Sequence, residues 1–124
     1  MSSSQAKYRS KLEKECHELL GKDWKYEPHR IAYIVRRNYT PDFVKGKYYI
    51  EVKGFFRVGD TQKYKAIAEQ LKAEGKHLVF LMPQPNKRTR KGGKITYTQW
   101  CAKHDIAIFS TKEIKELKEW TRKQ

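Results

Sequence analysis

The stretch YTPDFVKGKYYIEVK at residues 39–53 constrains the fold of this chain more than any other. Two strand-like runs flank Lys45-Gly46, a pair typical of tight turns, so the stretch predicts a β-hairpin. Successive side chains of a strand point to opposite faces of its sheet. Tyr49, Glu51 and Lys53 are therefore expected on one face of the second strand.

Three charged side chains of this hairpin are expected to converge. Glu51 and Lys53 are two residues apart on one strand, so their Cα atoms lie about 6.6–6.8 Å apart. Asp42 lies on the paired strand, and cross-strand neighbours approach within about 5 Å. Carboxylate oxygens suit hard cations such as Mg²⁺, and a bound divalent ion activates water for phosphoryl transfer. A lysine beside such an ion can orient the water or neutralise the charge that develops.

Charge composition separates this interpretation from a simpler one. An acid two residues before a lysine is common on exposed strands, so ordinary cross-strand ion pairing is the alternative. However, 28 Lys and Arg against 14 Asp and Glu give a net charge of +14, which favours a polyanionic partner, above all nucleic acid. Carboxylates are costly on such a surface unless a cation lies between them and the phosphate. The combination favours a metal-dependent nuclease.

Several other classes are disfavoured. No apolar run approaches the roughly 18 residues of a membrane span, and the start MSSSQAKYRSK has no apolar segment typical of a secretory signal. Two cysteines give no disulfide framework, so we expect a protein of a reducing cytoplasm. The spacing of Cys16-His17 and of Cys101 with His104 is poor for zinc, and burial in a core is the default expectation for both cysteines.

The remaining sequence predicts an α/β (α+β) fold with a mixed central sheet flanked by helices. Residues 1–124 are expected to form one domain, with residues 1–7 as a flexible basic tail. Apolar periodicity predicts helices at residues 5–20, 61–74 and 98–104, and a last helix that opens at a Ser110–Glu113 capping box. Further strands are expected around Ile31, Tyr33 and Val35, at 77–82 and at 106–109.

Pro41-Asp42 followed by Glu51-Val52-Lys53 resembles the signature of PD-(D/E)xK nucleases. A closer resemblance covers most of the chain, from about residue 8 to residue 109. Four blocks match in order the bacteriophage endonuclease I family of Holliday-junction resolvases, namely YRSKLE at 8–13, YTPDF at 39–43, EVKG at 51–54 and WCAKH at 100–104. The short signature is weakly specific, whereas four ordered blocks are much more so.

The resemblance implies a restriction-endonuclease-like fold in a domain-swapped homodimer. It implies a phage-encoded enzyme of the host cytoplasm that cuts four-way junctions and other branched DNA by hydrolysis. Mg²⁺, or Mn²⁺ in its place, is implied as two ions per site, with no small-molecule cofactor and no membrane partner. The alternatives are a nuclease of the same fold that cuts ordinary duplex DNA, and a non-catalytic nucleic-acid-binding module.

The resemblance also implies roles for individual residues. Asp42 would bridge two metal ions, Glu51 and Val52 would be ligands, and Lys53 would lie beside the attacking water. Glu13 would complete the second metal site from the other protomer. From the residues alone, Glu13 competes with the nearby Glu15 and Glu18, and each of the three is more typical of a solvated helix charge paired with a nearby lysine than of a metal ligand.

Basic residues on several segments are predicted to contact DNA. A lysine- and arginine-rich loop favours contact with a phosphate backbone, although a merely soluble loop is the alternative. No residue pattern indicates reading of base edges, so recognition by shape and backbone is expected. The predicted contacts are Arg9, Arg36, Arg37, Arg57, Lys63, Lys65, Lys87, Arg88, Arg90, Lys91 and Lys94.

Overall fold

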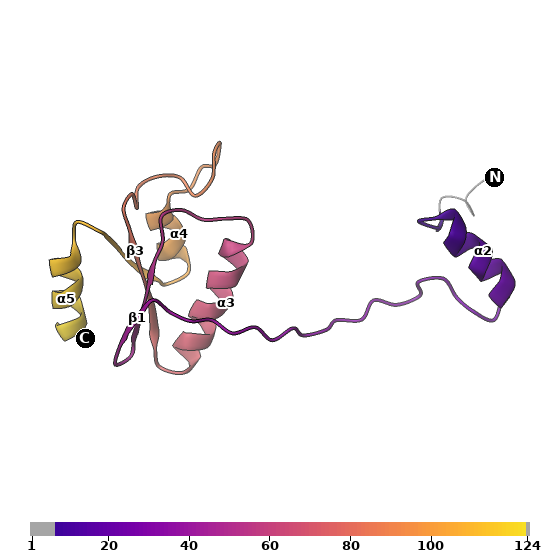
Figure 1. The fold of residues 1–124 in the computed structure, drawn as a ribbon, viewed down its shortest axis with the longest axis horizontal. Coiled ribbons are helices and arrows are strands. Elements are labelled where there is room, and N and C mark those ends of the chain that lie inside the picture. Colours follow the sequence, from indigo (N-terminus) through magenta and orange to yellow (C-terminus); the bar gives the residue numbers. More distant parts are fainter. Residues whose placement is uncertain (1–6, 124) are drawn as a thin grey trace. The chain divides into compact units, whose positions relative to one another are not determined.

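The computed structural model describes residues 7–123 and divides the chain into two compact units, Met1–Arg37 and Asn38–Gln124 (Figure 1). Each unit is described by itself below. The predicted basic tail at residues 1–7 lies, except for its last residue, outside the described residues. The assignment of all 124 residues to one domain stays a prediction.

The N-terminal unit contains the helix α2, Lys11–Leu20. It begins six residues later than the sequence predicts, because Ser10 is extended and its side chain accepts a hydrogen bond from the Glu13 amide as an N-cap. No residue of α2 is buried, and Leu12 and Leu19 are largely exposed. Cys16 is also exposed, so the expectation that it lies in a core is wrong.

The strand expected around residues 31–35 is wrong. Residues 28–41 contain neither helix nor strand, and Ile31, Tyr33 and Val35 are exposed. The alternation of apolar and polar residues is present, but a strand exists only when its backbone groups pair with a neighbouring strand. Within residues 7–37 the structure contains no second strand that offers such pairing.

The C-terminal unit is built on a four-stranded sheet with the strand order β1-β2-β3-β4. The strands are β1, Phe43–Lys45; β2, Tyr48–Val52; β3, His77–Met82; and β4, Ala107–Ser110. β1 and β2 form the predicted antiparallel hairpin, while β2, β3 and β4 are parallel. Gly46 has a φ of 57°, a left-handed conformation that favours glycine at this tight turn.

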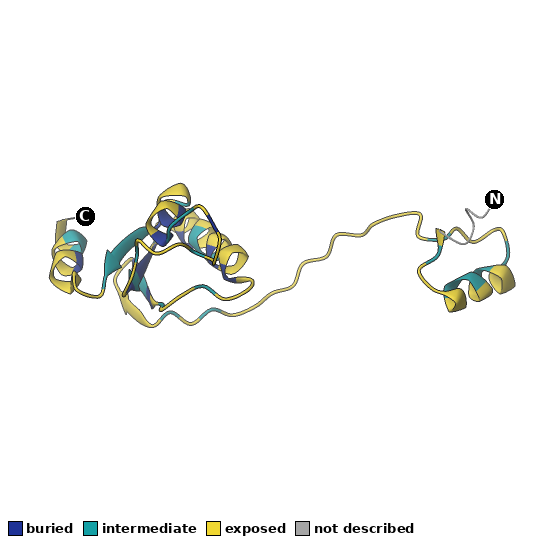
Figure 2. Ribbon diagram, turned by 90° about the horizontal axis from the view of Figure 1, so that it is seen from above, coloured by how far each residue is buried: buried dark blue, intermediate teal, exposed yellow. Residues whose placement is uncertain are grey.

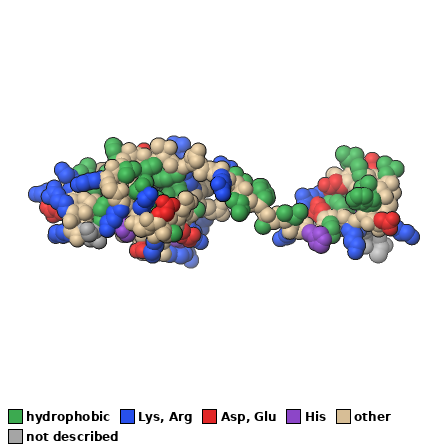
Figure 3. Space-filling view, turned by 90° about the horizontal axis from the view of Figure 1, so that it is seen from below, with side chains coloured by type: hydrophobic (Ala, Val, Ile, Leu, Met, Phe, Trp, Pro, Cys, Tyr) green, Lys and Arg blue, Asp and Glu red, His purple; other side chains and the backbone are tan. Residues whose placement is uncertain are grey.

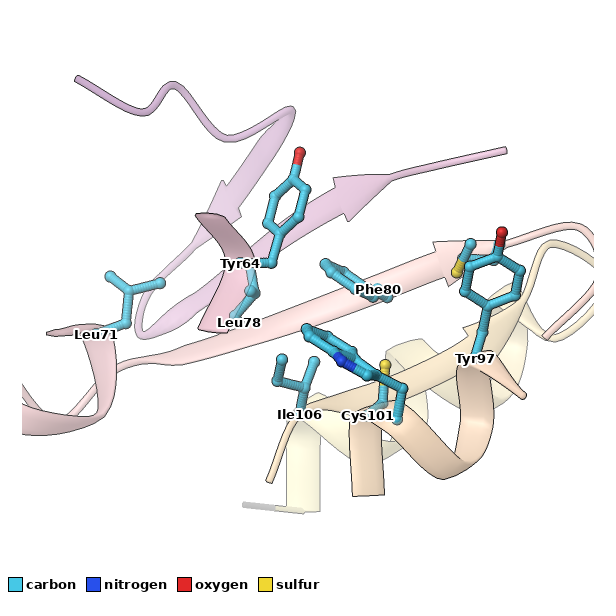
Figure 4. Close-up of a cluster of buried hydrophobic side chains, with 9 residues drawn as sticks. Tyr64, Leu71, Leu78, Phe80, Tyr97, Cys101 and Ile106 are labelled. Carbon is cyan, nitrogen blue, oxygen red and sulfur yellow. The ribbon is translucent and has the colours of Figure 1, made fainter. Parts of the chain in front are cut away.

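Helices cover both faces of the sheet (Figures 1 and 2). They are α3, Asp60–Ala73; α4, Tyr97–Lys103; and α5, Ile114–Lys123. α3 and α4 pack on one face around Tyr64, Phe80 and Trp100 (Figure 4). On the opposite face, α5 places Leu117 in a smaller cluster that includes Tyr48.

The predicted mixed α/β fold is therefore confirmed, and the helices of the C-terminal unit agree with their predicted positions to within one to four residues. β3 is buried on both faces as its continuous apolar run predicts, with Val79 and Phe80 completely inaccessible to solvent. Among the described residues, no helix combines the length and the apolar character needed to cross a membrane.

Phe80 is the best-buried aromatic residue of the larger core, with ring contacts to Phe56, Tyr64 and Trp100. We expect Phe80→Ala to lower the free energy of unfolding by about 3–5 kcal/mol, because it opens a cavity at this contact. Urea denaturation followed by circular dichroism measures this loss. Val58→Ala, at a fully exposed position, is the control and should change stability by less than about 0.5 kcal/mol. Similar losses for both variants would contradict the assignment of Phe80 to the core.

Candidate active site

The hairpin register brings the two predicted acids together. Phe43 pairs with Ile50, and Asp42, which directly precedes β1, donates its amide to the Ile50 carbonyl at 3.1 Å. The charges of Asp42 and Glu51 both contribute to raising the pKa of Tyr39 and of Tyr64, so the two carboxylates lie near the same pair of hydroxyls. The Asp42 Oδ2 atom also accepts a hydrogen bond of 2.8 Å from the Val52 amide, which fixes this carboxylate against β2.

Two tyrosine hydroxyls hold the carboxylate of Glu51. Tyr39 donates to Oε1 at 2.6 Å and Tyr64 donates to Oε2 at 3.0 Å. Glu51 is only 9% exposed, so these bonds replace much of the hydration that its charge loses. Burial and the Glu51 carboxylate raise the pKa of both tyrosines above the ordinary range, which keeps each hydroxyl protonated as a donor.

Lys53 continues β2 beyond its last residue, on the same face as Glu51. Its amide donates to the Leu81 carbonyl at 3.1 Å, so its backbone is held by β3. Its Nζ atom lies 3.4 Å from Asp60 Oδ2 and 5.2 Å from the centre of the Tyr64 ring. Asp60 opens α3 and accepts a second hydrogen bond from the Arg57 amide. The ammonium group is therefore held in place by an acid that is itself fixed.

These contacts do not match ordinary cross-strand ion pairing. Among the described residues, Lys53 pairs with Asp60, and neither Asp42 nor Glu51 forms an ion pair. The two carboxylates of the hairpin are instead held by neutral donors. This arrangement leaves their negative charge uncompensated by a protein cation.

The donor set fits a hard divalent cation. A carboxylate can accept about four hydrogen bonds or metal contacts, and the bonds above occupy one position on Asp42 and two on Glu51. Oxygen ligands of this kind are those that Mg²⁺ prefers. Within residues 7–123, however, no three His, Cys, Asp or Glu residues form a group able to hold a metal. The C-terminal unit thus supplies an incomplete set of two carboxylates.

Glu13 lies on α2 in the N-terminal unit. Its Oε1 atom accepts hydrogen bonds from the Tyr26 hydroxyl at 2.6 Å and from the Arg9 amide at 3.0 Å. The Tyr26 hydrogen bond is the main cause that lowers the pKa of Glu13, so the carboxylate is ionised at neutral pH. The competing Glu15 and Glu18 are both exposed.

The predicted DNA contacts are distributed over both units. Arg9 forms an exposed ion pair with Glu27 at 3.1 Å. Lys63 lies beside the acids, with its Nζ atom 5.9 Å from the Tyr39 ring centre and 5.2 Å from that of Tyr64. The other predicted contacts are all exposed, consistent with the Lys and Arg side chains visible in Figure 3: Arg36, Arg37, Arg57, Lys65, Lys87, Arg88, Arg90, Lys91 and Lys94.

Sequence reasoning missed Tyr39, Tyr64 and Asp60. Tyr64 belongs to the apolar stripe of a predicted helix, which gave no sign that its hydroxyl reaches Glu51. Tyr39 lies in a block that carries the family resemblance, which was the available signal. Tyr49 shares the face of Glu51 as predicted, but it packs against the larger core. Cys101 is buried in that core as expected, and burial raises the pKa of its thiol to about 12.

Comparison with known proteins gives a consistent result. A family model described as "Phage endonuclease I" matches residues 1–124. The chain is also similar to the "Endodeoxyribonuclease 1" of Enterobacteria phage T3. The two are 34% identical over 114 residues, which cover 86% of this chain and 73% of the phage T3 protein.

The raised tyrosine pKa values predict a specific loss of stability in alkali. In the unfolded chain a tyrosine ionises near pH 10, before it does so in the folded protein, so unfolding releases protons above that pH. Each such tyrosine should lower the free energy of unfolding by about 1.4 kcal/mol per pH unit. We expect Tyr64→Phe to remove one such contribution, so that its stability relative to the wild type improves as the pH rises above about 10.

Urea unfolding between pH 8 and pH 11.5 measures this difference. Tyr33→Phe is the matched control, because Tyr33 is 84% exposed and forms no hydrogen bond within the described part of the chain. Its stability should run parallel to that of the wild type. A difference between wild type and Tyr64→Phe that stays constant across this range would contradict the prediction.

Proposed function

Since the chain belongs to the phage endonuclease I family and is therefore a DNA endonuclease, we propose that it cuts four-way junctions and other branched DNA by metal-dependent phosphodiester hydrolysis. The observation that carries this proposal is the pair of carboxylates, Asp42 and Glu51, that the hairpin brings near the same two tyrosines, with Lys53 two residues beyond Glu51 on the same strand face. A basic protein of net charge +14 brings DNA phosphates to such a surface.

Asp42 and Glu51 are the proposed metal ligands of the C-terminal unit. Val52 would contribute its backbone carbonyl, since its side chain has no donor atom, and Glu13 would complete the set. Mg²⁺, for which Mn²⁺ would substitute, is proposed as two ions per site, and it would supply Lewis-acid activation of water and of the scissile phosphate. Tyr39 and Tyr64 keep the Glu51 carboxylate in one orientation for this task.

Lys53 has the chemistry to act on the substrate directly. Its ammonium carries three donors, and Asp60 holds it at the end of β2. One donor faces Asp60, which leaves others to orient the attacking water or to neutralise charge on the phosphate in the transition state. Asp60 itself would be a positioning residue, because it acts through Lys53.

A homodimer fits the same set of observations. The C-terminal unit offers two carboxylates, and Glu13 lies in the N-terminal unit. We propose that Glu13 completes the site of the partner protomer in a domain-swapped dimer. Two identical sites related by a two-fold axis match the symmetry of a four-way junction. The setting proposed for this activity is the host cytoplasm during phage growth.

Cleavage of an end-labelled four-way junction tests the proposal. With Mg²⁺ we expect paired cuts near the branch, with none in EDTA and much weaker cutting of a linear duplex with the same arm sequence. Asp42→Asn, Glu51→Gln and Lys53→Ala should each lower the rate at least about 100-fold, because each removes charge stabilisation at the reacting phosphate. Asp105→Asn, which disrupts an exposed ion pair with Lys72, is the control and should cut normally.

Two results would argue against parts of this proposal. Equal cutting of junction and duplex would retain the nuclease but remove the preference for branched DNA. Full activity of Asp42→Asn or Glu51→Gln would remove the hairpin from the active site. Circular dichroism of each variant separates a lost reaction from a lost fold.

Mixing two inactive variants tests whether Glu13 acts in the partner protomer. Glu13→Gln and Glu51→Gln should each be inactive alone. In a heterodimer, the Glu51 of one protomer meets the Glu13 of the other, so one of the two sites is intact. Random assembly would restore about a quarter of the sites, measured as nicking of a junction after the two chains are refolded together. Absence of recovery would place Glu13 in its own protomer's site, and full activity of Glu13→Gln alone would exclude it from either.

A further inference from the structure

Two loops follow the carboxyl ends of neighbouring strands, at the same end of the sheet and beside the proposed active site. β2 and β3 are parallel neighbours, so the segments that follow their carboxyl ends lie at one edge. One is the aromatic loop, residues 53–59, which begins at Lys53 and connects β2 to α3. The other is the basic loop, residues 87–96, which leads into α4 (Figure 1). Carboxyl edges of parallel strands are where open α/β sheets bind ligands.

The aromatic loop presents one phenylalanine outward and anchors the next one inward. Phe56 packs edge-on against Tyr97 and Trp100, with ring centres 4.9 and 5.0 Å apart, and its amide donates to the Tyr97 hydroxyl at 3.0 Å. Phe55 is 58% exposed, and the Arg57 guanidinium lies 5.7 Å from its ring centre. The buried neighbour therefore fixes the position of an aromatic surface that faces solvent.

The basic loop is also fixed. The Thr89 amide donates to the Ile95 carbonyl and the Tyr97 amide to the Lys87 carbonyl, both at 3.0 Å, so the loop folds back on itself as a short hairpin. Gly93 allows the tight approach of the chain at the tip of the loop, because a Cβ atom at this position would lie only 2.9 Å from the Arg90 side chain. The cations on this loop are thus presented on an ordered scaffold.

A cavity of about 600 Å³ opens between the two loops. Phe55, Phe56 and Tyr97 form its aromatic side. The basic side carries four cations, Lys87, Arg88, Arg90 and Lys91. No carboxylate of the described residues lines the cavity. An aromatic wall that faces a cationic wall is the combination with which proteins bind single-stranded nucleic acid, because bases stack on the rings and phosphates meet the cations.

We propose that this cavity binds one unstacked nucleotide of branched DNA, with its base on Phe55 and its flanking phosphates on the basic loop. This inference rests on the proposed function, and it names the feature of the substrate that the site selects. A base inside a continuous duplex has both faces covered by its neighbours. Only a base at a branch point, in a bulge or in a single strand can offer a free face to Phe55.

The cavity would then contribute to the choice of cleavage position. Phe55 lies two residues beyond Lys53 along the same backbone. A nucleotide held on Phe55 brings the adjoining phosphodiesters towards the carboxylates of the hairpin. Recognition of an unstacked base needs no base-specific hydrogen bonds, which agrees with the absence of any sequence-reading pattern on this chain.

Binding without cleavage provides the test. The full chain in EDTA is titrated into a four-way junction with 2-aminopurine at the branch, into a bulged duplex and into a linear duplex, all with the same arms. Stacking on Phe55 should change the fluorescence of the wild-type complex. Phe55→Leu, which keeps the apolar volume but loses the aromatic face, should bind branched and bulged DNA about 5- to 140-fold more weakly and leave duplex affinity within about twofold.

Two control variants separate stacking from charge and from general effects. Phe43→Leu alters another exposed phenylalanine, 61% accessible, that does not line the cavity, and it should leave every affinity unchanged. Arg88→Ala should weaken binding to all three DNAs alike and reduce their salt dependence by about one phosphate contact. Thermal melting of each variant verifies that it is folded.

The results bear on this inference and on the proposed function separately. Equal losses of Phe55→Leu on branched and duplex DNA, or no loss on either, would overturn the stacking site even if the wild type resolves junctions with Mg²⁺. A selective loss would support the site even if no cleavage were found. A change from dimer to monomer in Phe55→Leu, measured by light scattering, would instead assign the cavity to a second copy of the chain and overturn the inference.

Discussion

The pairing of β1 with β2 is the interaction on which the rest of the site depends. It brings Asp42, directly before β1, beside the end of β2, and the Asp42 carboxylate reinforces the pairing by accepting a hydrogen bond from the Val52 amide. A shift of one residue would move every side chain of one strand to the opposite face. The two acids would then point towards different cores, one covered by α3 and α4 and the other by α5. A turn of two residues around Gly46 sets this register, so a small local feature decides whether the site exists.

Burial of Glu51 connects this site to the stability of the whole C-terminal unit. A carboxylate that is 9% exposed is costly unless hydrogen bonds replace its hydration. Tyr64 supplies one of these bonds and also packs edge-on against Phe80 in the larger core. Through Tyr64, the hydrophobic core therefore holds in place a carboxylate that is proposed as a metal ligand. The same arrangement explains why the pKa of Tyr64 is raised, since burial disfavours its phenolate, which would also face the charge of Glu51.

The parallel half of the sheet brings the proposed catalytic and recognition elements together. Because β2 and β3 run in the same direction, Lys53, the exposed Phe55 and the basic loop all follow carboxyl ends at one edge. Phe56 and Tyr97 join the two loops through ring packing and one hydrogen bond. The proposed chemistry and the proposed recognition of an unstacked base thus occupy neighbouring positions on one scaffold. Their relative geometry is maintained by the packing of Phe56 and Tyr97 into the larger core.

The sequence by itself determined the hairpin, the shared face of Glu51 and Lys53, and most helices and buried strands. All of these follow from residue alternation, turn chemistry and apolar periodicity within a few neighbouring residues. The prediction of a strand at Ile31 to Val35 was wrong, because a strand needs a neighbouring strand to pair with. Local alternation of apolar and polar residues does not supply such a partner. Only the tertiary structure decided that Tyr39 and Tyr64 hold Glu51, that Asp60 holds Lys53, and that Phe55 faces a basic loop more than thirty residues away. These contacts depend on how α3, α4 and the sheet pack, and packing is set by the whole core at once.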